Sequence, residues 1–302
     1  MPKSIATLAL LLSLSLLAAI GDAQRNKVAA QEAQEGSIEQ TIPGHYRYES
    51  GTRVSGIIVT DDGIVVVDGL SSEEMGRHER QLIADRFGLP VRYLVSSTFH
   101  NNYTHGNVAY DDAIKIGHEA YKSDLLALMI EDGAAAAEQA ARLPDITYQE
   151  QMTITLGGKE IQIIYIGPAH TRGDSIVFVP EDRIVYVSEL LFYDRFPWMN
   201  SGYVNWINAI DRVLAMDADI FVPGQGPMTF SDPRESRDAM LRMRQVLVDA
   251  RDAVQQQIAQ GALEEEIVSN VMLQQHAELG GYRQQREVVL RRTYQDLQGT
   301  LE

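Results

Sequence analysis

Histidine, carboxylate and amide side chains recur in four short segments, most of them rich in the residue types found in loops. The segments, with the side chains in them that could bind an ion or move a proton, are Ser97–Gly106 with His100, Asn102 and His105, Gly167–Asp174 with His170, Val187–Leu190 with Glu189, and Pro223–Pro227 with Gln225. Imidazole nitrogens and carboxylate oxygens are zinc ligands in proteins, and the same groups act as general acids and bases. The residue types therefore predict a metal site or an acid–base site if the fold brings these segments together.

The first of these segments follows an apolar run that reads as a buried strand, so its histidines are expected on a loop at the carboxyl end of that strand. An Asp-Gly step between two β-branched runs further upstream predicts a hairpin, and Ser72 is a plausible cap for the helix that follows. The elements predicted in this half are strands Val54–Thr60 and Ile64–Asp68, helix Ser71–Phe87 and strand Val91–Val95. They form a ββαβ unit.

The second half of the sequence shows a similar succession. Its predicted elements are strand Ala113–Ile116, helices Tyr121–Ile130 and Ala134–Arg142, strands Met152–Leu156, Ile161–Ile166, Ser175–Val179 and Ile184–Val187, helix Asn205–Met216 and strand Ile220–Val222. Two ββαβ-like halves predict an α/β sandwich in which two mixed sheets lie face to face with helices outside.

In order and spacing, the four loop segments resemble the metal-binding loops of the metallo-β-lactamase superfamily. That family's usual pattern is His-x-His-x-Asp-His, then a lone His, an Asp and a last His. The corresponding residues here are His100, Asn102, Thr104, His105, His170, Glu189 and Gln225. The resemblance covers roughly residues 46–227 and implies a four-layer αββα sandwich, the metallo-β-lactamase fold, with extra C-terminal helices. The exported, glyoxalase II-like hydrolases are the most similar branch.

The resemblance also implies a ligand set for one metal ion. His100 and His170 match ligands of the family's first metal, and Asn102 stands where that metal has a third histidine. Glu189 stands where the family has the bridging Asp and is one methylene longer. A single divalent ion, with zinc as the first choice, is expected among His100, His170 and Glu189, with Asn102 or His105 completing the shell.

The same comparison shows that the family's second metal position has lost most of its ligands here. His105 matches one of its ligands, but Thr104 stands in place of an Asp and Gln225 in place of a His. Two metals are therefore not expected. Glu189 would serve as a general base, and His105 as a ligand or an acid/base.

The loop after Glu189 borders the mouth of the active site in this family. Tyr193, Arg195 and Trp198 are expected to hold a substrate with an apolar body and an anionic group, with Arg195 binding the anion. Tyr103, between the two histidines, and Gln225 are expected at the same mouth. The implied activity is hydrolysis of a small ester, thioester or lactone-like molecule.

Two other functions fit the same residues. Asn102, Thr104 and Gln225 could form a neutral hydrogen-bond network in a metal-free pseudoenzyme that binds a small molecule or a partner. Alternatively, His105 or His170 could do acid–base work in a metal-free enzyme. The cofactor is thus either one divalent ion or none.

The N-terminal residues suggest an exported protein. Residues 1–23 resemble a secretory signal peptide, with Lys3, an apolar run and Gly21-Asp22-Ala23 as a cleavage site. Residues 24–44 are expected to be a flexible lead-in, residues 45–230 the metallo-β-lactamase-like domain, and residues 231–302 helices packed on that domain, or else a separate helical module. The mature protein would be periplasmic or secreted, with no membrane insertion.

Composition narrows the partners. The net charge of -16 argues against binding to nucleic acid, because both molecules are anionic. The chain has no cysteine, so thiolate metal sites and a cysteine nucleophile are excluded. A small-molecule substrate remains the expected partner, and the sequence does not indicate an oligomeric state.

Overall fold

The computed structural model describes residues 36–198, 202–226, 228–229 and 232–301. The signal-peptide prediction and most of the predicted lead-in lie outside these residues. The end of that lead-in is not the flexible segment we expected, because β1 (Ser37–Ile42) pairs antiparallel with β2 (His45–Ser50). Ile38 and Thr41 of β1 are buried, so the ordered fold begins before residue 45.

Twelve strands of the described chain join edge to edge in the order β7-β6-β5-β4-β3-β12-β11-β10-β9-β8, with β2 on β3 and β1 on β2. The remaining strands are β3 Arg53–Thr60, β4 Gly63–Val67, β5 Val91–Ser96, β6 Ile114–His118, β7 Ile146–Tyr148, β8 Gln151–Leu156, β9 Lys159–Tyr165, β10 Ser175–Val179, β11 Ile184–Phe192 and β12 Ile220–Gln225. The pairs β4–β5, β5–β6, β6–β7 and β11–β12 are parallel, and the others are antiparallel. The sheet is therefore mixed, as predicted.

Local signals in the sequence explain the first half. β3 and β4 form the predicted hairpin around the Asp-Gly turn. The helix α2 (Glu73–Phe87) begins where Ser72 accepts a hydrogen bond from the backbone N–H of Met75, and it ends at Gly88, whose φ of 64° suits glycine. Both elements confirm the predicted ββαβ unit.

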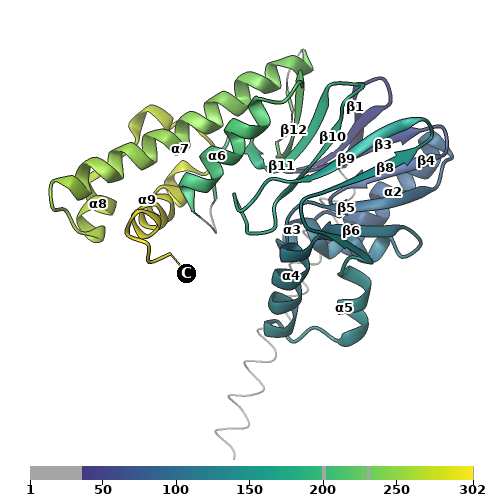
Figure 1. Cartoon of the computed structure of the whole chain (residues 1–302), viewed down its shortest axis with the longest axis horizontal. Coiled ribbons are helices and arrows are strands. Elements are labelled where there is room, and N and C mark those ends of the chain that lie inside the picture. The colour runs from purple at the N-terminus through teal and green to yellow at the C-terminus, as the bar shows by residue number, and fades with distance from the viewer. Residues whose placement is uncertain (1–35, 199–201, 227, 230–231, 302) are drawn as a thin grey trace, which may run out of the picture.

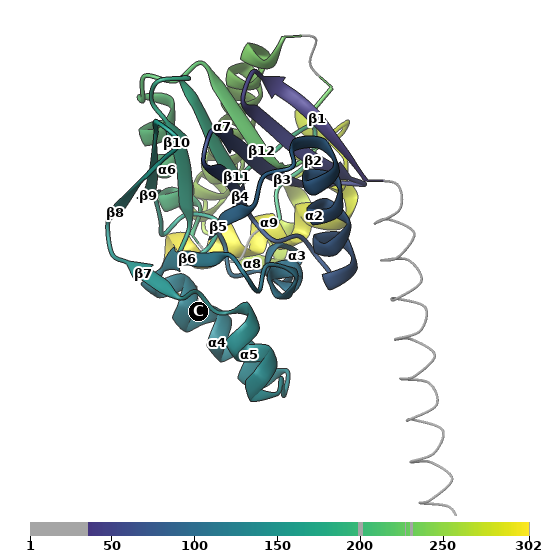
Figure 2. The same cartoon turned by 90° about the vertical axis from the view of Figure 1, so that its right-hand side faces the viewer.

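The sheet is divided into two halves where β12 meets β3, because these strands share only the pair Gln225 and Arg53. Apolar side chains from β3 and β4 pack against side chains from β8 to β11 in one buried cluster, so the halves face each other. The helix α2 packs on the outer face of the first half, and α6 (Tyr203–Leu214) and α7 (Ser236–Ala259) pack on that of the second (Figures 1 and 2). The predicted four-layer αββα sandwich is confirmed.

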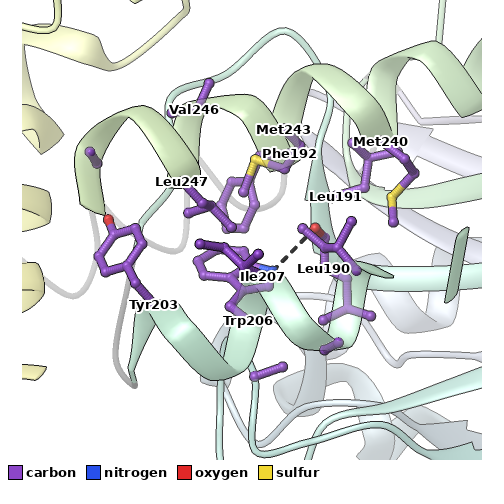
Figure 3. Packing of buried hydrophobic residues seen from close by; sticks show 14 of the residues in the cluster. Leu190, Leu191, Phe192, Tyr203, Trp206, Ile207, Met240, Met243, Val246 and Leu247 are labelled. Atoms are coloured by element: carbon purple, nitrogen blue, oxygen red, sulfur yellow. Dashed lines mark hydrogen bonds between the residues drawn. The ribbon is translucent and has the colours of Figure 1, made fainter. Parts of the chain in front are cut away.

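Helices after residue 231 share the core of the second half-sheet. Figure 3 shows α6 and α7 closing over Leu190, Leu191 and Phe192, with Trp206 between them. The other helices are α3 Asn101–Thr104, α4 Glu119–Glu131, α5 Ala136–Arg142, α8 Glu264–Asn270 and α9 Tyr282–Gln298. Among the described residues, no helix combines the length and the apolar character that crossing a bilayer requires.

Candidate metal centre

All four loop segments meet at one edge of the sandwich, because each follows or ends a strand of the sheet. His100 comes four residues after β5, Glu189 lies within the final part of β11, and Gln225 ends β12. His170 lies on the loop between β9 and β10. The prediction ended the Glu189 strand at Val187, but β11 continues to Phe192 with every residue buried. Ser188 and Glu189 therefore project into the site from a strand and not from a loop.

The carboxylate of Glu189 is the centre of this cluster. Its Oε2 atom lies 2.6 Å from His100 Nδ1 and 3.3 Å from His170 Nδ1. Thr98 Oγ1 donates to the same oxygen at 3.2 Å, and Gln225 Nε2 donates to Oε1 at 3.4 Å. One ligand atom from each of His100, His170 and Glu189 lies within 4.8 Å of the others. The fold therefore brings together the three residues predicted to hold the ion.

His170 is the most enclosed member of the cluster. Its side chain is fully buried, and neither ring nitrogen has a hydrogen-bond partner of acceptable geometry among the described residues. The ring centroid lies 4.8 Å from that of His100 and 4.9 Å from that of Trp206. Buried polar atoms without partners are rare in native proteins and mark strained sites, functional groups or positions for an ion or water.

Electrostatics favour the charged carboxylate. Burial alone would raise the pKa of Glu189, but the charges of His170 and His100 outweigh burial and hold that pKa well below its usual range. Burial alone would lower the pKa of His170, and the Glu189 charge outweighs it and raises that pKa. The cluster thus holds a buried anion that attracts a proton or another cation.

Asp68, directly after β4, supports this edge of the sandwich. It accepts hydrogen bonds from the backbone N–H and the hydroxyl of Ser97, both at 2.8 Å, and from the Ser188 hydroxyl at 2.6 Å. Burial raises the pKa of Asp68 to about 6. Asp68 and Ser188 have φ values of 71° and 47°, in the left-handed region that non-glycine residues seldom adopt. Such strain persists where surrounding contacts over-determine it, and it is frequent at functional sites.

A pocket of about 460 Å³ opens over the cluster. His100, Asn102, Glu189 and Gln225 line it together with Arg195 and Trp198 of the loop after β11. The lining also includes Phe99 and Phe196, and three residues outside every segment singled out in the sequence: Arg53, Leu128 and Phe192. Arg53 is brought here by its pairing with Gln225 across the β12–β3 junction, a contact that only the fold reveals.

Two predicted substrate-binding tyrosines lie elsewhere. Tyr103 is fully buried and donates a hydrogen bond to the carbonyl of Gly224 at 2.9 Å, so it ties the histidine loop to β12 and presents no surface to a substrate. Tyr193 contacts Thr229 through its hydroxyl and packs against the core cluster around Trp206. Neither side chain lines the pocket as the structure describes it.

His105 is also displaced from its expected role. It begins the short 3-10 helix that follows α3, and it is not among the described residues that cluster with His100, His170 and Glu189. Burial lowers its pKa, and the charge of Arg142 lowers it further. The buried Arg142 guanidinium reaches beneath this turn and donates to Thr104 Oγ1 at 2.8 Å. The position of His105 therefore supports neither ligation nor acid–base work at this centre.

The chain belongs to the metallo-β-lactamase superfamily, whose family model matches residues 51–225. That span contains His100, His170, Glu189 and Gln225, so the family match and the structural cluster coincide. The family is typically metal-dependent, and its members include hydrolases that act on small molecules.

Curated relatives share lower identity over part of their length. The chain is 26% identical over 171 residues to the 2,4-dinitroanisole O-demethylase subunit alpha of Nocardioides sp. This alignment covers 54% of this chain and 49% of that protein. It is 22% identical over 275 residues to a linear primary-alkylsulfatase of Pseudomonas sp., covering 75% and 51%. It is 24% identical over 163 residues to the metallo-beta-lactamase type 2 of Elizabethkingia meningoseptica, covering 51% and 62%. The chain thus spans about half to three fifths of these relatives.

Solved structures agree on the fold. A metallo-beta-lactamase from Pontibacter korlensis superposes with a TM-score of 0.58 at 18% identity, covering 71% of this chain and 99% of that one. A stereoselective inverting sec-alkylsulfatase from Pseudomonas sp. gives 0.70 at 15% identity, covering 88% and 51%.

The cluster fits a metal ion of the kind that the family implies. It offers two imidazole nitrogens and a carboxylate oxygen, which is a donor set suited to zinc. Neither nitrogen of buried His170 makes a hydrogen bond of acceptable geometry within the described residues, although Nδ1 lies 3.3 Å from Glu189. This observation favours an ion, because a metal bond would satisfy one of the two nitrogens. Asn102, exposed on the pocket wall, remains a predicted further ligand.

Proposed function

We propose that this protein is an exported hydrolase that binds one divalent ion, zinc first, through His100, His170 and Glu189, and that it cleaves a small ester, thioester or lactone-like substrate. The observation that carries the proposal is the convergence of these three donors within 4.8 Å beneath a pocket. The relatives named as alkylsulfatases favour ester chemistry and add sulfate esters to the candidate substrates. Export rests on the leader-like residues 1–23.

When bound, a divalent ion at this site supplies Lewis acidity toward the ester and toward water. The protein's own part is positioning and proton transfer. Glu189 Oε2 faces both histidines, whereas Oε1 receives only the long Gln225 hydrogen bond among the contacts described. Oε1 is therefore the atom that we assign as proton acceptor, oriented by Gln225. The aromatic wall formed by Phe192, Phe196 and Trp198 limits water around the reacting bond.

Metal content tests this proposal. The wild type should carry about one ion per chain, as a site with three protein ligands does, and His100→Ala and His170→Ala should each lose it. His276→Ala is the matched control, since His276 pairs with Asp249 away from the cluster. Elemental analysis by mass spectrometry of tag-free protein provides the measurement. An ion-free wild type, even after incubation with zinc, would reject the metal-dependent function.

Activity should follow the metal. An aryl acetate, an acyl thioester, a γ-lactone and an alkyl sulfate form the first substrate panel. Turnover of any one of them should disappear with a chelator, return with zinc, and be absent in His170→Ala.

One observation favours a metal-free enzyme as a second candidate. The 2.6 Å hydrogen bond between His100 and Glu189 is a carboxylate–imidazole pair of the kind used in acid–base catalysis. That enzyme would lose turnover in His100→Ala yet keep it in the presence of a chelator, which separates it from the metal-dependent hydrolase.

A further inference from the structure

The catalytic pocket combines two arginines with an apolar wall. Arg53 and Arg195 both line it, together with Phe99, Leu128, Phe192, Phe196 and Trp198. Glu189 is the one carboxylate of this lining, and it is engaged by His100 and His170. Two cationic side chains thus lie beside an apolar wall, although the chain has a net charge of -16.

Both arginines are anchored by the backbone. Arg53 begins β3 and pairs with Gln225 of β12, and its guanidinium carbon lies 6.0 Å from the Tyr103 ring centroid. Arg195 lies in the turn after β11, which is held against Gly280 by a hydrogen bond from the Phe196 N–H at 2.9 Å and one from the Gly280 N–H to Asp194 at 3.1 Å. The two side chains thus come to one cavity from segments far apart in the sequence.

Neither guanidinium forms an ion pair with a carboxylate of a described residue. Within the described chain no ion pair joins Arg53 or Arg195 to an aspartate or glutamate, whereas Arg242, beside Arg195, lies 4.0 Å from Asp194. An arginine fork binds oxyanions through charge-assisted hydrogen bonds. Two such groups at one half-buried site attract an anion much more strongly than water-exposed arginines do.

We propose that Arg53 and Arg195 together bind an oxyanion on an otherwise apolar substrate, and that the aromatic wall takes the apolar body. Sulfonate, phosphonate, sulfate and carboxylate groups share the chemistry that the two forks recognise. This proposal rests on the proposed hydrolase function and adds to it the position of the substrate's charged group, beside the His100–His170–Glu189 cluster. Binding of the anion itself does not depend on which bond is cleaved.

Calorimetric binding of unreactive probes tests the pair. Octane-1-sulfonate, octylphosphonate and octanoate are compared with uncharged octan-1-ol, on the protein as purified and after chelation, so that ligation of an ion cannot stand in for the arginines. At least one of the three anions should bind more tightly than octan-1-ol in both preparations. Arg53→Gln and Arg195→Gln should each weaken that anion about tenfold, which is about 1.4 kcal/mol, and leave octan-1-ol unchanged.

Arg77→Gln is the matched control, because Arg77 is an exposed arginine of α2 outside the pocket, and it should bind every probe as the wild type does. Circular dichroism and melting temperature confirm that the variants are folded. Equal binding of octan-1-ol and all three anions, or wild-type anion binding in both pocket variants, would overturn the proposal. Loss of anion binding on chelation alone, with the arginines without effect, would also overturn it. The metal-content result decides the proposed function separately.

Discussion

At the scale of single residues, the site is organised around buried carboxylates with different tasks. Glu189 stays ionised because two histidines face it, whereas Asp68 is held by hydroxyl and amide donors and has a pKa raised to about 6. Glu79 of α2 is fully buried farther from the pocket, and it accepts hydrogen bonds from Ser55 and Tyr110. Partners decide which of these groups can take part in chemistry.

Glu79 should make the protein less stable as the pH rises. Burial raises its pKa to about 8 from an ordinary 4.5, despite the Ser55 and Tyr110 hydroxyls, and the Asp68 charge raises it further. Between these two values the folded protein retains a proton that the unfolded chain has released. Stability from this group is therefore full below pH 4.5 and is lost as the pH rises toward 8.

Glu79→Gln replaces the titratable carboxyl group with a neutral amide and keeps the shape of the side chain. Relative to this variant, the wild type should lose at least about 1 kcal/mol of unfolding free energy between pH 5 and pH 9, given about 1.4 kcal/mol for each unit of pKa difference. Urea unfolding at both pH values measures the change. Since Asp68 and Tyr110 remain in both proteins, their titration cancels in the comparison. Parallel pH profiles would mean that Glu79 is ionised in the native state.

At the scale of elements, short-range signals were predictable and long-range ones were not. The β3–β4 hairpin and the start of α2 follow from an Asp-Gly turn and a serine cap, which act within a few residues. The strand β1 was missed because its side chains are largely polar and it is stabilised by pairing with β2. The polar Ser188 and Glu189 suggested that a strand had ended, but β11 continues because it pairs with β12.

The same distinction holds for the site. His100, His170 and Glu189 were predicted from their segments, and the fold brings them together. Arg53 could not be predicted, because nothing local marks it and its partner Gln225 is far along the chain. His105 was predicted at the same centre, but the cluster found among the described residues holds His100, His170 and Glu189 and not His105. Arg142 of α5, which contacts the turn that holds His105 from a distant segment, lowers the pKa of this histidine.

Arg142 should stabilise the histidine loop from α5. Its guanidinium is 3% exposed and donates to Asn101 Oδ1 at 2.7 Å and to Thr104 Oγ1 at 2.8 Å. Arg142→Met leaves these acceptors without their donor and should lower the unfolding free energy by about 1–3 kcal/mol. Arg172→Met removes a largely exposed arginine paired with Asp124 of α4, and should cost less than about 1 kcal/mol.

Urea denaturation of both variants and the wild type gives the comparison. Equal losses from Arg142→Met and Arg172→Met would show that the buried hydrogen bonds of Arg142 add nothing to the fold. Because α3 follows His100 directly, Arg142→Met should also weaken retention of an ion, which elemental analysis measures on the same samples.

At the scale of the whole molecule, the site lies where two halves of the fold meet. The β12–β3 junction brings Gln225 next to Arg53, and the helices that cover the second half-sheet contribute Gly281 and Gln285 to the pocket. The core formed by α6 and α7 over β11 reaches His170 through the ring of Trp206. Stability of that half and geometry of the site are therefore coupled.

Variants of the chain's two tryptophans can distinguish the stability of this half from the geometry of the site. Trp206 is fully buried, and its indole N–H donates to the carbonyl of Leu190 at 3.3 Å (Figure 3). Trp198 lines the pocket and is 47% exposed. Trp206→Ala should lower the unfolding free energy by about 3–5 kcal/mol, as large core truncations do, and Trp206→Phe should recover most of this loss. Trp198→Ala should change it by no more than about 0.5 kcal/mol, as surface substitutions do.

Function should respond in a different order. Trp206→Ala removes a packing partner of His170, so it should lower ion retention even under conditions where the protein is fully folded. Trp198→Ala should keep the ion and instead weaken binding of octane-1-sulfonate, because it removes part of the apolar wall. Urea unfolding, elemental analysis and calorimetry on the two variants measure all three quantities. If Trp198→Ala destabilised the fold as much as Trp206→Ala, Trp198 would belong to the core, and the apolar wall would lose its proposed role in binding.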